Sequence, residues 1–137
     1  MDNADVCERV LKSIGQLFDC REEGEYIRIR TPYLYPDSDV IDLYCRDSGD
    51  LLEVTDLGET SRWLRTQTLR LRGSAKQAAP IADICANHDV EWHRGVLHAR
   101  VRSVDELGDA VLRVAQAAIQ VSLLLEVTPR CATVNRP

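Results

Sequence analysis

Residues 53–60 read Glu-Val-Thr-Asp-Leu-Gly-Glu-Thr, and this stretch marks the point where a strand turns into a helix. Up to Thr55 the side chains alternate with period two, which is typical of a strand with one buried face. Asp56 and Glu59 then have the spacing of a capping box, in which both side chains accept hydrogen bonds from backbone N–H groups at a helix start. The stretch predicts a strand that ends near Thr55 and a short helix over residues 59–66.

Two further alternating segments precede this strand, at residues 26–30 and 40–46. The connection Asp47-Ser48-Gly49-Asp50 has the composition of a hairpin turn and leads into the strand over residues 51–55. Residues 31–39 hold two prolines and are expected to form a loop. Together these segments predict a three-stranded antiparallel meander.

The alternation sorts the side chains of the meander onto two faces. A turn that is symmetric about residues 47–50 places Arg46 opposite Leu51 and Tyr44 opposite Glu53. One face is expected to be core, and its members are Ile27, Ile29, Ile41, Leu43, Cys45, Leu52 and Val54. The other face is either solvated or a binding face, and its members are Tyr26, Arg28, Arg30, Asp42, Tyr44, Arg46 and Glu53.

Helices are predicted on both sides of the meander. Residues 5–18 carry apolar side chains at helical spacing, and the acidic stretch over residues 19–25 is expected to end this helix. Residues 74–87 also read as a helix, whose firm part begins at Pro80. Residues 69–72 favour neither helix nor strand.

The last third of the sequence predicts a hairpin followed by a long helix. A two-residue turn at Arg94-Gly95 places Trp92 opposite Leu97 on an apolar face. A second capping box, Ser103-Val104-Asp105-Glu106, opens a long amphipathic helix that Pro129 is expected to end.

This order of elements indicates the α+β class, with an antiparallel sheet of about five strands and helices packed on one face. The chain has 137 residues, of which 45% are hydrophobic and 28% charged, as in an ordinary globular protein. We expect a single domain over residues 1–128 and a flexible tail over residues 129–137. Whether the meander and the later hairpin share one sheet stays open.

A cytoplasmic protein with no membrane contact is expected. No run approaches the roughly 20 apolar residues that span a bilayer, and the N-terminus lacks the basic and apolar regions of a secretory signal. The five cysteines are scattered without a Cys-x-x-Cys pair, so neither a metal site nor a cofactor is predicted. Cys45 and Cys85 read as small buried apolar residues.

The stretch from Ile29 to Gly58 has a proline-containing loop, a strand pair and a Thr55-Asp56-x-Gly58 turn. In these features it resembles an uncharacterised bacterial and phage family, the domain of unknown function 1828, over about residues 26–125. The resemblance implies a small accessory protein of prophages or mobile elements, with a role in phage–host conflict. It implies no activity and no catalytic residues.

A metal-dependent nuclease is the enzymatic hypothesis, because carboxylates are dense over residues 37–59. Such centres hold Mg²⁺ with strand-borne carboxylates, and the candidates are Asp42, Glu53 and Asp56. Such centres also use a lysine two residues after the second carboxylate, where this chain has Thr55. The alternative is that these carboxylates serve solvated turns and a helix cap.

Three histidines, His88, His93 and His98, could be read as metal ligands. The predicted hairpin register places His93 opposite Val96 and His98 opposite Glu91. A zinc centre needs about four converging ligands, so exposed histidines on strands are the expected outcome.

A basic segment follows the acid-rich meander in a protein of net charge −5. Residues 61–82 contain no acidic side chain and five basic ones, which are Arg62, Arg65, Arg70, Arg72 and Lys76. This segment is a solvated basic face, a contact for an acidic protein surface, or a nucleic-acid contact. The acidic total and the lack of a helix-turn-helix signature argue against nucleic acid.

The polar sheet face is a second candidate for partner binding, because arginine and aromatic side chains are enriched at interfaces. Its candidates are Tyr26, Arg28, Arg30, Tyr44 and Arg46, with Tyr33 and Tyr35 as possible extensions. The alternative is ordinary cross-strand pairing, such as Arg28 with Asp42. Small residues on the last helix allow packing on the sheet or a homodimer.

The sequence thus predicts a small non-enzymatic binding protein with a protein partner, and the family resemblance implies that a phage or mobile element encodes it. Its most concrete role is to inhibit or modulate a host defence complex. The alternatives are a divergent metal-dependent nuclease and a nucleic-acid-binding accessory subunit.

Overall fold

One antiparallel sheet organises the chain in the computed structural model, which describes residues 2–68 and 78–134 and has six strands in them. The strands are β1 (Asp19–Glu23), β2 (Tyr26–Leu34), β3 (Val40–Ser48), β4 (Leu51–Thr55), β5 (Glu91–His93) and β6 (Val96–Val101). Their order across the sheet is β1-β2-β3-β4-β6-β5. The meander and the later hairpin therefore share one sheet, joined where β4 pairs with β6.

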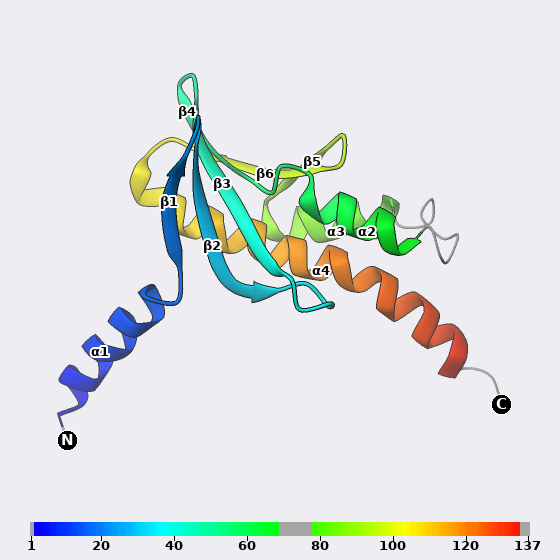
Figure 1. Ribbon diagram of the computed structural model, residues 1–137, viewed down its shortest axis with the longest axis horizontal. Coiled ribbons are helices and arrows are strands. Elements are labelled where there is room, and N and C mark those ends of the chain that lie inside the picture. The colour runs from blue at the N-terminus through cyan, green and yellow to red at the C-terminus, as the bar shows by residue number, and fades with distance from the viewer. Residues whose placement is uncertain (1, 69–77, 135–137) are drawn as a thin grey trace.

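The helices lie mainly on one side of this sheet (Figure 1). They are α1 (Asn3–Gly15), α2 (Glu59–Thr68), α3 (Ala78–His88) and α4 (Leu107–Val134), and a short 3-10 helix, η2 (Val104–Glu106), leads into α4. The long helix α4 contacts β2, β3, β4 and β6, and both α2 and α3 pack against it. The predicted α+β class, with a long C-terminal helix, is confirmed.

The core lies between the sheet and α4. Four apolar side chains on the strands are fully buried, and these are Ile41, Leu43, Val54 and Leu97. Facing them, α4 buries small residues, including Ala110, Val114, Ala117, Ala118 and Val121, which allow the helix to lie close to the sheet. Cys45 and Cys85 are buried as predicted. Within the described residues, the segment Val104–Leu124 is long and apolar enough to cross a membrane, and here it supplies much of this core.

The turn between β3 and β4 is tighter than predicted. Arg46 lies opposite Glu53 rather than Leu51, so the predicted register is wrong by two residues. Gly49, with φ 76°, takes the left-handed conformation that a two-residue turn requires. Because the error is an even number of residues, every side chain stays on its predicted face.

Two segments predicted as irregular are strands instead. Asp19–Glu23 forms β1, whose side chains are all exposed, so that no alternation between apolar and polar residues revealed it. The strand β2 continues through Pro32 to Leu34, with an irregular register between Arg30 and Leu34. A proline is tolerated at such an irregularity because no ladder hydrogen bond is needed from its nitrogen.

The two ends of the chain also differ from expectation. The helix α1 forms where predicted, but it projects from the sheet (Figure 1) and, although described in full, buries none of its residues. Ile27, predicted as core, is likewise exposed on the neighbouring part of the sheet. The helix α4 continues past Pro129 to Val134, since a proline inside a long helix can be accommodated at the cost of one hydrogen bond.

The turn from β4 into α2 is built on the carboxylate of Asp56, which has no solvent exposure. It accepts hydrogen bonds from the backbone nitrogens of Gly58 at 2.8 Å and Thr60 at 3.2 Å, which start α2. It also accepts one from the nitrogen of Leu97 on β6, at 3.0 Å. Burial raises the pKa of Asp56, and these N–H donors oppose the rise. One side chain thus joins β4, α2 and β6.

Only the first half of the predicted capping box is formed. In a complete capping box the Glu59 side chain would accept a hydrogen bond from the backbone nitrogen of Asp56. That nitrogen instead donates to the carbonyl oxygen of Leu97 at 3.1 Å, and Glu59 pairs with Arg62 at 2.6 Å. The start of α2 also lies against the β5–β6 turn, where a Cβ atom added to Gly95 would be 2.9 Å from Ser61 Oγ. The helix is therefore anchored by the Asp56 cap together with tertiary contacts, without the second half of a capping box.

Asp56→Ala is expected to lower the free energy of unfolding by about 3 kcal/mol, because three buried N–H groups lose their acceptor. Asp56→Asn keeps one carbonyl oxygen and should lose about half as much. Urea denaturation followed by circular dichroism measures both. The control is Asp109→Ala on the exposed side of α4, expected to change stability by less than about 0.5 kcal/mol. Equal losses in Asp56→Ala and the control would contradict this account.

Candidate binding face and pocket

The sheet face turned away from α4 carries polar side chains on neighbouring strands. Strand pairing places Arg28 opposite Tyr44, and Glu53 between Arg46 and Arg100. We call this surface the open face, and its members are Tyr26, Arg28, Arg30, Asp42, Tyr44, Arg46, Glu53, Glu91, His98 and Arg100. The predicted polar face is thus one continuous surface, which β5 and β6 extend.

Asp42 holds two arginines at one end of the open face. It accepts hydrogen bonds from Arg28 Nε and Arg30 Nε, both at 3.2 Å, and Arg28 also reaches Glu23 at 3.3 Å. The Asp42 side chain is only 13% exposed, and burial alone would raise its pKa, but the two guanidinium groups outweigh burial and lower it. The cross-strand pairing of Arg28 with Asp42 is confirmed.

Glu53 organises the other end of the open face. Its carboxylate lies 3.4 Å from Arg46 Nε and 3.6 Å from Arg100 Nε. His98 Nδ1 lies 3.2 Å from Glu91 and 3.9 Å from Glu53. Flanked by these side chains, His98 is only 7% exposed, so the prediction of an exposed histidine is wrong at this position. The sequence signal for this cluster was the pairing of His98 with Glu91, which the structure confirms.

Two tyrosines connect these ends. Arg46 donates a hydrogen bond to Tyr26 Oη at 3.1 Å, and its guanidinium carbon lies 5.3 Å from the centre of the Tyr26 ring. Tyr26 and Tyr44 meet edge to face, with ring centres 6.0 Å apart. The structure therefore brings together all five sheet residues predicted to bind a partner.

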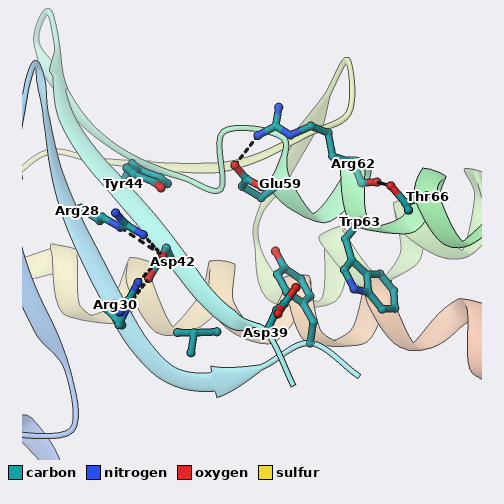
Figure 2. A pocket seen from close by; sticks show the side chains of 11 residues that line it. Arg28, Arg30, Asp39, Asp42, Tyr44, Glu59, Arg62, Trp63 and Thr66 are labelled. Atoms are coloured by element: carbon teal, nitrogen blue, oxygen red, sulfur yellow. Dashed lines mark hydrogen bonds and ion pairs between the residues drawn. The ribbon is translucent and has the colours of Figure 1, made fainter. Parts of the chain in front are cut away.

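A pocket of about 610 Å³ lies between the open face and α2. Figure 2 shows Arg28 and Arg30 converging on Asp42 at one wall, with Arg62 and Trp63 of α2 at the other. The remaining lining residues are Tyr35, Asp39, Val40, Tyr44, Glu59 and Thr66. No sequence pattern predicts this pocket, because its walls meet only through the placement of α2.

The aromatic wall of the pocket is a stack of Tyr35 on Trp63, with ring centres 5.7 Å apart and planes at 11°. The hydroxyl of Tyr35 is 2.8 Å from Thr60 Oγ1, and burial raises the pKa of Tyr35. Tyr35 is thus a buried anchor for α2 as well as a lining residue. Tyr33 packs edge to face on Phe18 and does not extend the open face.

The basic segment is described only in part. Arg62 lines the pocket and is paired with Glu59, and Arg65 lies exposed on α2. Three members of the predicted set lie outside the described residues, and these are Arg70, Arg72 and Lys76.

The three carboxylates proposed for a nuclease do not converge. Glu53 lies opposite Arg46, which is four residues along β3 from Asp42. The backbone positions of Asp42 and Glu53 are therefore about 13 Å apart along the strand direction at the usual strand rise. Asp56 is occupied by backbone N–H groups. Within the described part of the chain, no group of three or more His, Cys, Asp or Glu side chains is placed to hold a metal ion.

Comparison with known families assigns the chain to one of them. A family model described as "Domain of unknown function DUF1828" matches residues 31–121, more than half of the chain. The chain belongs to this family. No curated protein and no solved structure matches it. The DUF1828 segment holds β3 to β6, α2, α3 and the first half of α4, and therefore most of the open face and the α2 wall of the pocket. Outside it lie α1, β1 and the pocket residues Arg28 and Arg30.

A double-mutant cycle tests the buried contact between Tyr35 and Thr60. Tyr35→Phe and Thr60→Val should each lower the free energy of unfolding by about 1–2 kcal/mol, with a coupling energy of about 1 kcal/mol. Thermal or urea unfolding measures all three variants. Tyr33→Phe is the matched control, because its hydroxyl bonds to none of the described residues. Strictly additive losses would show that the hydroxyl pair does not hold α2.

Proposed function

We propose that this DUF1828 protein is a non-enzymatic binding protein that acts by protein–protein contact through the open face and its pocket. The observation that carries the proposal is a sheet surface rich in arginine and tyrosine beside a pocket with an aromatic wall. Such residues dominate the binding energy of protein interfaces. We further propose a phage or mobile-element origin, a cytoplasmic location, and inhibition or modulation of a host defence complex as the role.

The charges of the open face favour a protein partner over nucleic acid. Arg28 and Arg30 share Asp42, and Arg46 and Arg100 share Glu53. Arg28 also pairs with Glu23 and Arg100 with Glu91, so that four carboxylates balance the four arginines. Affinity for nucleic acid comes from cationic side chains that neutralise phosphates and release their counterions. These arginines are less available for that role, because they already have carboxylate partners. The pairs also hold the guanidinium groups in place, which reduces the entropy lost when a partner docks.

A nucleic-acid-binding accessory subunit is the second candidate, because the basic segment over residues 62–76 supplies several cations. A titration with labelled DNA and RNA at low salt separates it from the first. We expect no binding to either. Affinity that falls steeply as salt rises would instead support nucleic acid.

Capture from a host lysate, quantified by mass spectrometry, tests the main proposal. Arg30→Ala and Thr66→Arg alter the rim and the mouth of the pocket, and each should reduce the captured partner by about tenfold. Asp83→Ala on the exposed side of α3 is the matched control and should capture as much as the unaltered protein. Circular dichroism verifies that each variant is folded.

Two outcomes would overturn the proposal. One is a partner whose capture is the same with Arg30→Ala and Thr66→Arg as with Asp83→Ala. The other is cleavage of labelled DNA or RNA by the purified protein when Mg²⁺ or Mn²⁺ is added, which would revive the metal-dependent nuclease.

A further inference from the structure

The N-terminal arm, which we define as residues 2–25, contains a helix with an unpartnered apolar face. None of the residues of α1, which is described in full, is buried. Leu11 is 66% exposed and Leu17 is 61% exposed, and Val10 and Ile14 on the same side are also exposed. A helix of 13 residues is marginal in water without packing on its apolar side. This face therefore has the character of a surface that another chain covers.

The same arm presents a free sheet edge. The strand β1 is the outermost strand on its side of the sheet, and all its residues are exposed. An edge strand offers a row of unpaired N–H and C=O groups to a further strand. Its charged side chains are a usual protection against uncontrolled pairing, but such protection does not account for the apolar face of α1.

The arm also carries most of the net charge of the protein. Residues 1–25 contain seven acidic and three basic side chains, which gives −4 out of the total of −5. Asp5 pairs with Arg9 and Asp19 with Arg21. Four further carboxylates form no ion pair with any described residue, and these are Asp2, Glu8, Glu22 and Glu25. A basic partner would therefore be complementary in charge to this surface.

A second copy of the chain fits this surface poorly. The antiparallel register that would pair the whole of β1 with its symmetry mate sets Asp19 opposite Glu23 and Arg21 opposite Arg21. Like charges directly opposite one another destabilise a strand pair, and two arms of charge −4 repel each other. Charge complementarity therefore selects a different, basic chain.

We propose that the N-terminal arm is a second docking surface, which binds a basic and apolar segment of a partner protein as an added strand on β1 that also covers α1. The arm lies outside the segment matched by the family model, residues 31–121, so it is an addition to the shared domain. The proposal goes beyond the open face, because it assigns a separate surface and the chemistry of its partner.

Selection of random dodecapeptides displayed on phage, with the full-length protein immobilised at near-physiological salt, tests the proposal. Selected peptides should be enriched in lysine or arginine together with apolar residues. Their affinity should fall about tenfold in Leu11→Ser/Ile14→Ser and in Glu22→Lys/Glu25→Lys, and stay unchanged in Asp83→Ala on the exposed side of α3. Hydrogen exchange should show peptide-induced protection of the amides of residues 19–23.

Several outcomes overturn the inference. One is the selection of neutral or acidic peptides, or of no peptide that prefers the unaltered protein over Leu11→Ser/Ile14→Ser. Another is protection that maps to the open face instead of β1. A third is a dimer, detected by light scattering, that Leu11→Ser/Ile14→Ser abolishes, because the second copy would then be the occupant. The first and third of these results do not depend on whether the open face binds a partner.

Discussion

The buried carboxylate of Asp56 determines how the parts of this molecule fit together. It receives N–H donors from the start of α2 and from Leu97 on β6, which is 41 residues away in the chain. A carboxylate without solvent exposure is costly unless such bonds are made, so few other placements of α2 are compatible with it. The pocket follows from this constraint, because α2 supplies one of its walls and the open face supplies the other.

The carboxylates that suggested a metal centre in the sequence have another use in the structure. Asp42 pairs with two arginines of β2, and Glu53 lies between an arginine of β3 and one of β6; both carboxylates hold the guanidinium groups in fixed positions. A half-exposed ion pair contributes little to stability. The larger consequence of these pairs is a surface whose charged side chains are ordered and whose net charge is close to zero. Such a surface suits a protein partner with a complementary shape better than a phosphate backbone.

Local patterns predicted the parts of this fold that depend on local physics. Alternation assigned the two faces of the meander even though the turn register was wrong, because an even shift leaves the faces unchanged. Strand β1 was missed since its side chains are all exposed, and the burial of His98 was missed because Glu53 comes from a strand far away in sequence. The pocket could not be predicted, as it depends on the contact between Asp56 and Leu97.

Charge divides the molecule into two surfaces of different physical character. Residues 26–137 contain fifteen acidic and fourteen basic side chains, so the part with the open face is close to neutral, whereas residues 1–25 carry −4. An ordered, neutral face gains specificity from the shape and placement of its side chains. An acidic arm with an exposed apolar helix gains binding affinity from long-range attraction to a basic chain and then from burial of the apolar face of the helix. Since the two surfaces depend on different interactions, salt should weaken binding at the arm far more than binding at the open face.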